Sequence, residues 1–174
     1  MLHSGPSTQV CVSGALFSAE GKLLLLRRAE ADAWELPGGA LEFGEAPELG
    51  LVRCFREATD MDISVDRPLS AWSALAPHPT LSPGGRGQGE LTPPSPQGGR
   101  GQGEGADGGE QHRVHLAFVV RLSGALLSVE LERAEHAGFA WLARGEALAR
   151  AGVSPWRAVV EKAFATLAQT RRNG

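Results

Sequence analysis

Arg53 and Glu57 stand one helical turn apart in a segment, from Pro47 to Thr59, whose composition predicts a helix. Pro47 falls where the first turn of a helix tolerates proline. A carboxylate on such a helix could bind a hard divalent cation, because these ions prefer oxygen ligands. It could equally form a surface ion pair with the arginine one turn before it. Spacing alone leaves both interpretations of Glu57 open.

A glycine turn precedes this helix. Trp34 to Leu36 reads as a short strand that is stopped by Pro37-Gly38-Gly39, so a loop feeds the helix. Cys54 lies within the helix beside the arginine, and cysteine is among the residue types most often buried. We therefore expect a packed thiol there, in preference to a nucleophile or a zinc ligand.

The stretch from Trp34 to Met61 resembles the box of the Nudix (MutT-like) hydrolase family. The family pattern is Gly, five residues, Glu, seven residues, then Arg-Glu-aliphatic-any-Glu-Glu-any-Gly-aliphatic. The matching residues, in register, are Gly39, Glu45, Arg53 and Glu57, with Phe55 and Met61 at the two apolar places. The surrounding phrases Trp-Glu-Leu-Pro-Gly and Glu-Phe-Gly-Glu are also similar to those of the family.

The resemblance implies a metal-dependent hydrolase of a nucleoside diphosphate linked to another group, with Mg²⁺ or Mn²⁺ as cofactor. On this basis, metal ligands are expected at the Gly38 carbonyl and at Glu57, which is also the expected catalytic residue. Gly39, Glu45 and Arg53 are expected to have structural roles, with the Glu and Arg tying the loop to the helix.

Three positions of the box depart from the family pattern. Cys54 and Ala58 stand where the pattern has Glu, and Asp60 stands where it has the helix-ending Gly. Of the clustered carboxylates only Glu57 remains, and a neutral thiol is a poor ligand for a hard ion. The box is therefore degenerate. Other acidic residues could replace the missing ligands, and the candidates are Glu42, Glu48, Asp60, Glu132 and Glu135.

Substrate-binding residues are expected beside the box. Arg27 and Arg28 end a predicted strand and could meet phosphates, and Glu42 lies in the loop before the helix. Trp34 and Trp72 could stack on a base, but both lie in predicted strands, where we expect core packing.

The expected fold class is α/β in the broad (α+β) sense, with a mixed β-sheet sandwiched between helices, as the Nudix resemblance implies. Val10 to Phe17 and Lys22 to Arg28 read as a β-hairpin around Glu20-Gly21. Further extended segments are predicted at 63–65, 69–75, 114–122, 126–129 and 138–142. A last helix should begin with Ser154 as N-cap and Pro155, and its apolar stripe from Trp156 to Leu167 indicates a core-facing surface.

One segment differs from the rest in composition. Residues 77–110 are rich in Gly and Pro, and 84–90 is repeated word for word at 98–104. We expect a disordered, low-complexity insertion within a single domain spanning 1–174. An RNA-binding Arg-Gly box is the alternative, but the segment has two arginines, no aromatic residue and a negative net charge.

The overall composition limits the kinds of partner that the protein is expected to bind. A formal net charge of -3 and a pI near 6.0 argue against a nucleic-acid binder, and a nucleotide-type small molecule fits better. The two cysteines are consistent with a reducing, cytoplasmic location, and no signal peptide or membrane span is expected. The sequence does not specify the oligomeric state.

Three functions stay open. The first is the Nudix-type hydrolase, with activity reduced by the missing carboxylates. The second is an inactive Nudix module that binds a nucleotide or a protein. The third is a decaying gene product, since a repeat insertion and losses within the box are both expected without selection.

Overall fold

The computed structural model describes residues 7–29, 33–76, 111–124, 131, 136–152 and 155–173. Its elements are β1 (Ser7–Leu16), β2 (Leu23–Arg28), β3 (Trp34–Glu35), β4 (Gly38–Ala40), α1 (Pro47–Thr59), β5 (Ile63–Ala76), β6 (Gln111–Leu122), β7 (His136–Leu142), α2 (Arg144–Ala151) and α3 (Pro155–Asn173).

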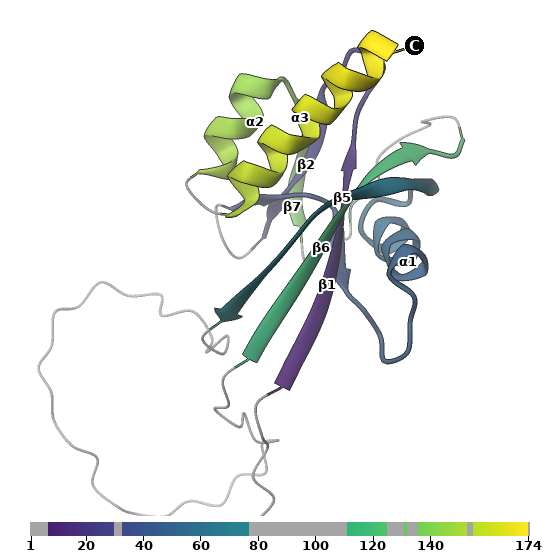
Figure 1. Ribbon diagram of the computed structural model, residues 1–174, viewed down its shortest axis with the longest axis vertical. Coiled ribbons are helices and arrows are strands. Elements are labelled where there is room, and N and C mark those ends of the chain that lie inside the picture. The colour runs from purple at the N-terminus through teal and green to yellow at the C-terminus, as the bar shows by residue number, and fades with distance from the viewer. Residues whose placement is uncertain are drawn as a thin grey trace, which may run out of the picture.

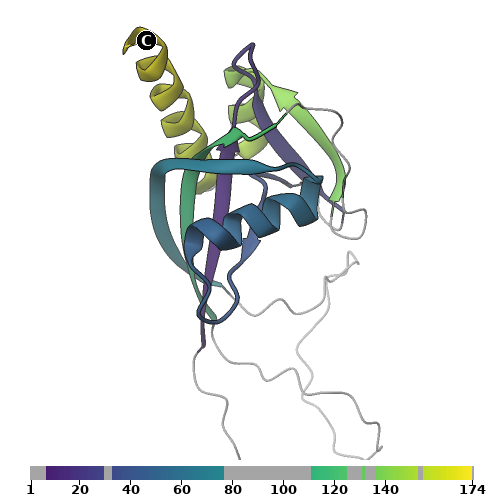
Figure 2. The same ribbon diagram turned by 90° about the vertical axis from the view of Figure 1, so that its right-hand side faces the viewer.

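The strands form two sheets. One is mixed, with the order β4-β1-β6-β5, in which β1 and β6 run parallel; the other is antiparallel, with the order β3-β2-β7. Helix α1 lies on one side of the mixed sheet, and α2 and α3 lie on the other side (Figure 1; Figure 2). The expected fold class, a mixed sheet between helices, is confirmed.

Two hydrophobic clusters hold these layers together. The first packs α1, through Leu51 and Phe55, against Val12 of β1; the second packs Val159 and Val160 of α3 behind the sheets. Strand β2 belongs to both clusters, because its successive leucines point alternately to opposite faces and all four are buried. The box helix and the C-terminal helix are thus fixed to opposite faces of one framework.

Helix α1 has the bounds that the sequence predicts. Pro47 occupies its first turn, and the helix ends at Asp60, whose φ of 55° is left-handed and whose N–H donates to the Arg56 carbonyl at 2.8 Å. Glycine adopts this conformation most readily, but a short Asp side chain tolerates it. The helix therefore keeps its normal end although the family's glycine is missing.

The sequence predicted that β1 and β2 pair as a hairpin, and this prediction is wrong except next to the turn. The two strands share only the isolated bridge between Phe17 and Leu23 and then diverge into different sheets. Both edges of β1 are already taken, since β6 pairs with one and β4 with the other. Strand β2 therefore pairs with β3 and β7 instead.

Other boundaries also differ from the predictions. The segments 63–65 and 69–75 form one strand, β5, whose register shifts between Val65 and Arg67 and again between Pro68 and Ser70. The glycine turn contains the short strand β4, and α2 is a helix that the sequence did not predict. The predicted strand 126–129, the insertion 77–110 and the cap Ser154 lie outside the described residues.

Helix α3 confirms the predicted C-terminal helix. It begins at Pro155, and its stripe buries Val159, Val160 and Ala163. Among the described residues, no helix combines the length and apolarity that a bilayer crossing requires.

Candidate functional site

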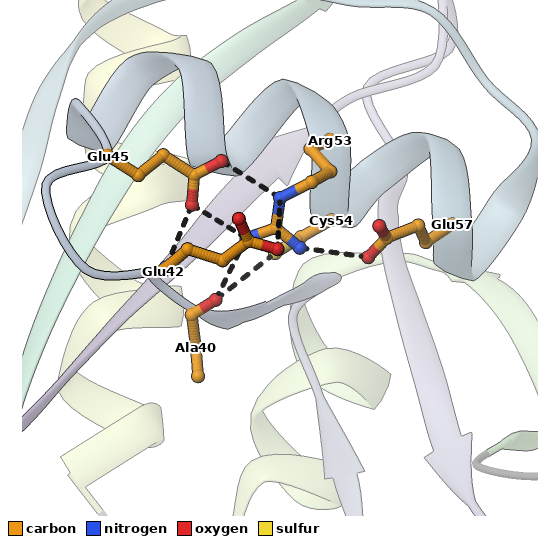
Figure 3. Close-up of polar contacts among 6 residues, drawn as sticks. All are labelled: Ala40, Glu42, Glu45, Arg53, Cys54 and Glu57. Atoms are coloured by element: carbon orange, nitrogen blue, oxygen red, sulfur yellow. Dashed lines mark hydrogen bonds and ion pairs between the residues drawn. The ribbon is translucent and has the colours of Figure 1, made fainter.

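The loop between β4 and α1 is tied to the helix by one arginine (Figure 3). Arg53 donates from Nε to Oε1 of Glu45 at 2.8 Å and from Nη2 to Oε2 at 2.7 Å. The same Nη2 donates to the Ala40 carbonyl at 3.1 Å, and Glu45 also accepts the Glu42 N–H at 3.0 Å. This bidentate ion pair, together with its hydrogen bonds to the Ala40 carbonyl and the Glu42 N–H, fixes the loop against the middle of α1.

The pair also sets the charges of its members. Hydrogen bonds from Arg53 first, and from the Glu42 backbone second, lower the pKa of Glu45 to about 2. The pKa of Arg53 is raised further, mainly by its hydrogen bonds to Glu45. Glu45 therefore stays ionised at neutral pH and is a poor proton acceptor.

The two glycines of the turn allow close contacts. A Cβ at Gly38 would lie 2.0 Å from the Val12 carbonyl oxygen, and a Cβ at Gly39 would lie 2.9 Å from the Cys54 Sγ. Strand β4 can therefore pair with β1 while α1 packs directly over it. Larger residues would separate these three elements.

The box residues of α1 fall into two stripes. Arg53 and Glu57 lie on the more exposed stripe, with side chains 29% and 59% exposed, and Nη1 of Arg53 donates to Oε2 of Glu57 at 3.1 Å. Cys54 and Ala58 lie one turn apart on the buried stripe, 4% and 6% exposed, within the first hydrophobic cluster. Two positions where the family pattern has Glu are thus part of the core in this chain.

A divalent metal needs more oxygen ligands than this face supplies. Burial raises the pKa of the Cys54 thiol, whose Sγ contacts the Ala40 carbonyl at 3.8 Å, so Cys54 is a protonated packing residue. Because alternate carbonyls of a strand point the same way, the Gly38 carbonyl faces the same side as that of Ala40. Gly38 and Glu57 therefore provide two donors, and Glu57 is already paired with Arg53.

The other acidic residues in the described ranges do not complete the set. No group of three His, Cys, Asp or Glu side chains with the spacing of a metal site occurs in the described part of the chain. Oε1 of Glu42 lies 4.0 Å from Nε of Arg53. Glu48 is in the exposed first turn of α1, and Asp60 caps the C-terminal end of this helix. Glu132 and Glu135 lie outside the described residues. Among the residues that the structure describes, the donors do not fit a Mg²⁺ or Mn²⁺ site.

A pocket of about 220 Å³ opens beside the box loop, between the two sheets. Its walls come from β1, β6, β2, β3, β4, β7 and α3, and Arg28 and Gly38 are among the lining residues. Arg27 and Glu42 are not among the described residues that line it. Of the three substrate-binding candidates from the sequence, the structure brings only Arg28 to this pocket.

Glu35 joins two of the pocket's basic side chains. Its Oε2 lies 3.6 Å from Nη1 of Arg28, and its Oε1 lies 3.7 Å from Nε2 of His136. His136 is 5% exposed and Ser13 is 4% exposed. Within the described residues, neither Nδ1 of His136 nor Oγ of Ser13 has a hydrogen-bond partner. Two buried polar atoms of residues beside the pocket are therefore left without a protein partner in the described part of the chain.

An aromatic group forms another wall. His115 is stacked on Trp72 with ring centroids 4.9 Å apart, and Trp156 meets both rings edge-on. His115 and Trp156 line the pocket, and burial lowers the pKa of His115. Trp72 packs behind them, and the Trp34 ring lies 4.5 Å from the Arg150 guanidinium carbon; both tryptophans are half-buried and pack against the second hydrophobic cluster, at its margin.

Sequence reasoning did not single out Ser13, Glu35 or His136 as site residues. One signal was present: Ser13 is a polar residue that interrupts the apolar run of β1. His136 and Glu35 have no fixed spacing from it, because strands from two sheets bring them together. Only the tertiary structure connects the three.

Three features define the class of protein: the α+β architecture, the glycine turn after β3, and a helix α1 that is tied to the preceding loop by the Arg53–Glu45 pair. The sequence model of the NUDIX domain family matches residues 7–164. This chain belongs to the Nudix family, whose hydrolases act on nucleotide-type small molecules and generally use divalent metals such as Mg²⁺.

Known proteins resemble the chain to different extents. A MutT-like protein from Streptomyces ambofaciens is 44% identical over 63 residues, which cover 36% of this chain and 41% of that protein. The crystal structure of a MutT protein from Methanosarcina mazei Go1 is 20% identical, covers 99% of both chains and has a TM-score of 0.59. A NUDIX hydrolase from Nitrosomonas europaea is 16% identical, covers 92% of this chain and 90% of its own, and has a TM-score of 0.63. The likeness to the two structures is one of fold.

Proposed function

We propose that this Nudix protein binds a nucleoside-diphosphate-type small molecule in the pocket between its sheets, and that its box helix does not support efficient metal-dependent hydrolysis. The observation that carries the proposal is the buried stripe of α1. Cys54 and Ala58 occupy, as packing residues, the positions where the family pattern has carboxylates.

Two features support binding. Arg28 lies at the pocket with its side chain 55% exposed, so it can meet an anionic group of the ligand. The turn at Gly38 and Gly39 also lines the pocket and keeps the close backbone contacts described above. A ligand in this pocket would thus lie against the same loop that the family's chemistry uses.

A second candidate function is the metal-dependent hydrolase itself. The clamp between Glu45 and Arg53 is complete, and Glu57 is at its family position. Such a scaffold would support catalysis if further oxygen ligands came from outside α1 and the turn. The proposal of a binding protein requires that these ligands do not assemble.

Calorimetric titration tests the binding proposal. ADP-ribose, dATP and a sugar nucleotide are titrated in the presence of EDTA, so that binding is measured without metal. At least one should bind, and Arg28→Ala should weaken it roughly tenfold, because a charge-assisted hydrogen bond is lost. Arg27→Ala is the matched control and should change affinity by less than about twofold. Failure of all three compounds to bind would overturn the proposal.

A further inference from the structure

We infer that the second half of β5, residues 70–76, pairs antiparallel with the same segment of a second copy of this chain, so that two mixed sheets join edge to edge. The observation behind this inference is a difference between the two halves of β5. One half carries the features that prevent edge pairing, and the other half carries none of them. The inference is independent of the proposed function.

Strand β5 forms one edge of the mixed sheet. In the order β4-β1-β6-β5, it pairs with β6 on one side and, within the described ranges, with no strand on the other (Figure 1). The strand at the opposite edge, β4, has 3 residues, whereas β5 has 14. A long edge strand presents a row of backbone N–H and C=O groups to which another strand can bond.

The first half of β5 is protected against such pairing. It contains adjacent charges at Asp66 and Arg67, followed by Pro68, which has no N–H to donate. The register against β6 shifts twice here, between Val65 and Arg67 and between Pro68 and Ser70. Charges, proline and bulges are devices by which natural proteins block edge-to-edge association. The first half therefore makes a poor template for another strand.

None of these devices continues into the second half. Residues 69–76 include no charged residue, no proline and no glycine, and the register of 70–76 against β6 is regular. Leu75 is 69% exposed, although it is a large apolar side chain. The exposed residues of this half are Ala71, Ser73, Ala74 and Leu75. An uncharged, regular and exposed edge of this kind is suited to pairing with a further strand.

The side chains of this half are complementary to those of an identical strand. If two copies pair antiparallel about Ser73, Leu75 lies opposite Ala71 of the second copy on one face, and Trp72 lies opposite Ala74 on the other. Each large side chain then meets a small one, with Cβ atoms about 4.5–5.5 Å apart. No like charges face each other, and a charged peptide would find no opposite charge here. A two-fold arrangement also closes after two copies.

Sedimentation velocity of the intact protein, over roughly 2 to 200 µM, tests the inference. A single pair of short strands makes a small interface, so we expect a weak dimer with a Kd on the order of 10 µM. Leu75→Lys should raise the Kd at least about tenfold, because a charge on the edge opposes pairing. Ser64→Lys, at an exposed position in the protected half, is the matched control and should keep the Kd within about twofold of the wild type.

Cysteine cross-linking tests the register. Ser73→Cys places two thiols opposite each other across the two-fold axis, where a disulfide can form when the dimer is oxidised with diamide. Ser64→Cys is the control, because position 64 lies outside the pairing segment. Its cross-linked fraction should not exceed the background from the free thiols Cys11 and Cys54. Non-reducing electrophoresis should show a covalent dimer for Ser73→Cys.

The results separate clearly. A dimer that Leu75→Lys weakens, together with cross-linking selective for position 73, is the result that the inference predicts. A wild type that stays monomeric up to about 200 µM would overturn the inference, and so would equal dimerisation of the wild type and Leu75→Lys. Equal cross-linking at positions 64 and 73 would also overturn it. This cross-linking comparison decides the question even if Leu75→Lys fails to fold.

Discussion

Arg53 and Glu45 are joined by two parallel hydrogen bonds, of 2.8 and 2.7 Å, that hold the β4–α1 loop on the helix. The pair is intact in a chain whose neighbouring carboxylates are missing from the box. The role of the pair can therefore be separated from metal binding. The pair shapes the loop, whereas metal binding in the family pattern uses carboxylates at positions 54 and 58, where this chain has Cys and Ala.

Glu45→Gln should lower the Tm by a few degrees at neutral pH, because it weakens the clamp. The effect should depend on pH. With a folded pKa of about 2, the carboxylate contributes stability above its unfolded pKa of about 4.3, and this contribution is lost as the pH falls toward the folded value. The Tm difference between wild type and variant should therefore shrink between pH 6 and pH 2.

Glu48→Gln is the control for this experiment, since Glu48 is an exposed carboxylate in the first turn of α1. Its Tm should stay close to that of the wild type throughout. A constant difference between wild type and Glu45→Gln across the whole pH range would contradict the assigned role of the ionised carboxylate.

Gly38→Ala should be strongly destabilising, since the new Cβ would lie 2.0 Å from the Val12 carbonyl oxygen. The strand β4 must then move away from β1, and we expect a cost of about 1–3 kcal/mol in urea unfolding. Gly145→Ala, in α2, meets nothing within 4 Å and should be neutral or slightly stabilising. Equal stabilities of the two variants would show that β4 does not pack as described.

The sequence predicted the box helix and α3 because each has a strong local signal. Pro47 and Pro155 mark the starts, and the stripe from Trp156 to Leu167 has helical spacing. The hairpin prediction failed because local turn chemistry does not tell which edges of β1 are already occupied. Helix α2 was missed because it is short, contains Gly145 and buries only two alanines.

The candidate site was predicted only in part, for a related reason. Arg53 and Glu45 are linked by a motif of fixed spacing, so the sequence could place them together. The pocket joins Ser13, Glu35 and His136 across two sheets, and no spacing rule connects such positions. That Ala58 is core and Glu57 is exposed also depends on how α1 packs, since both belong to the same box pattern.

The double substitution Cys54→Glu with Ala58→Glu should destabilise the protein in EDTA, because it brings two carboxylates onto the buried stripe. Millimolar Mn²⁺ should raise the Tm of the double variant, since with Glu57 it rebuilds a cluster of three carboxylates on one helix. The wild type should show no such shift.

Adding Glu57→Gln to the double variant provides the control and should abolish most of the Mn²⁺ effect. Calorimetric titration with Mn²⁺ gives the affinities directly. If the folded double variant gained no metal affinity, residues 54, 57 and 58 would not face a common metal position.

Replacing residues 77–110 with a short glycine-containing turn should leave the Tm nearly unchanged. The expectation of a dispensable insertion comes from its composition. The structure adds that Ala76 and Gln111, which flank the segment, are paired across β5 and β6, so a short connection can close the hairpin. A fall in Tm of several degrees would show that the segment contributes to packing.

We propose that the box helix of this chain does not support efficient metal-dependent turnover. Phosphate release, coupled to a phosphatase where needed, measures this directly over nucleoside triphosphates, ADP-ribose, dinucleotides and sugar nucleotides, in Mg²⁺, in Mn²⁺ and in EDTA. The wild type should show at most weak hydrolysis, and Glu57→Gln should hardly change it. Robust turnover of any of these compounds that requires metal and is lost in Glu57→Gln would contradict the claim and establish the chain as an active hydrolase.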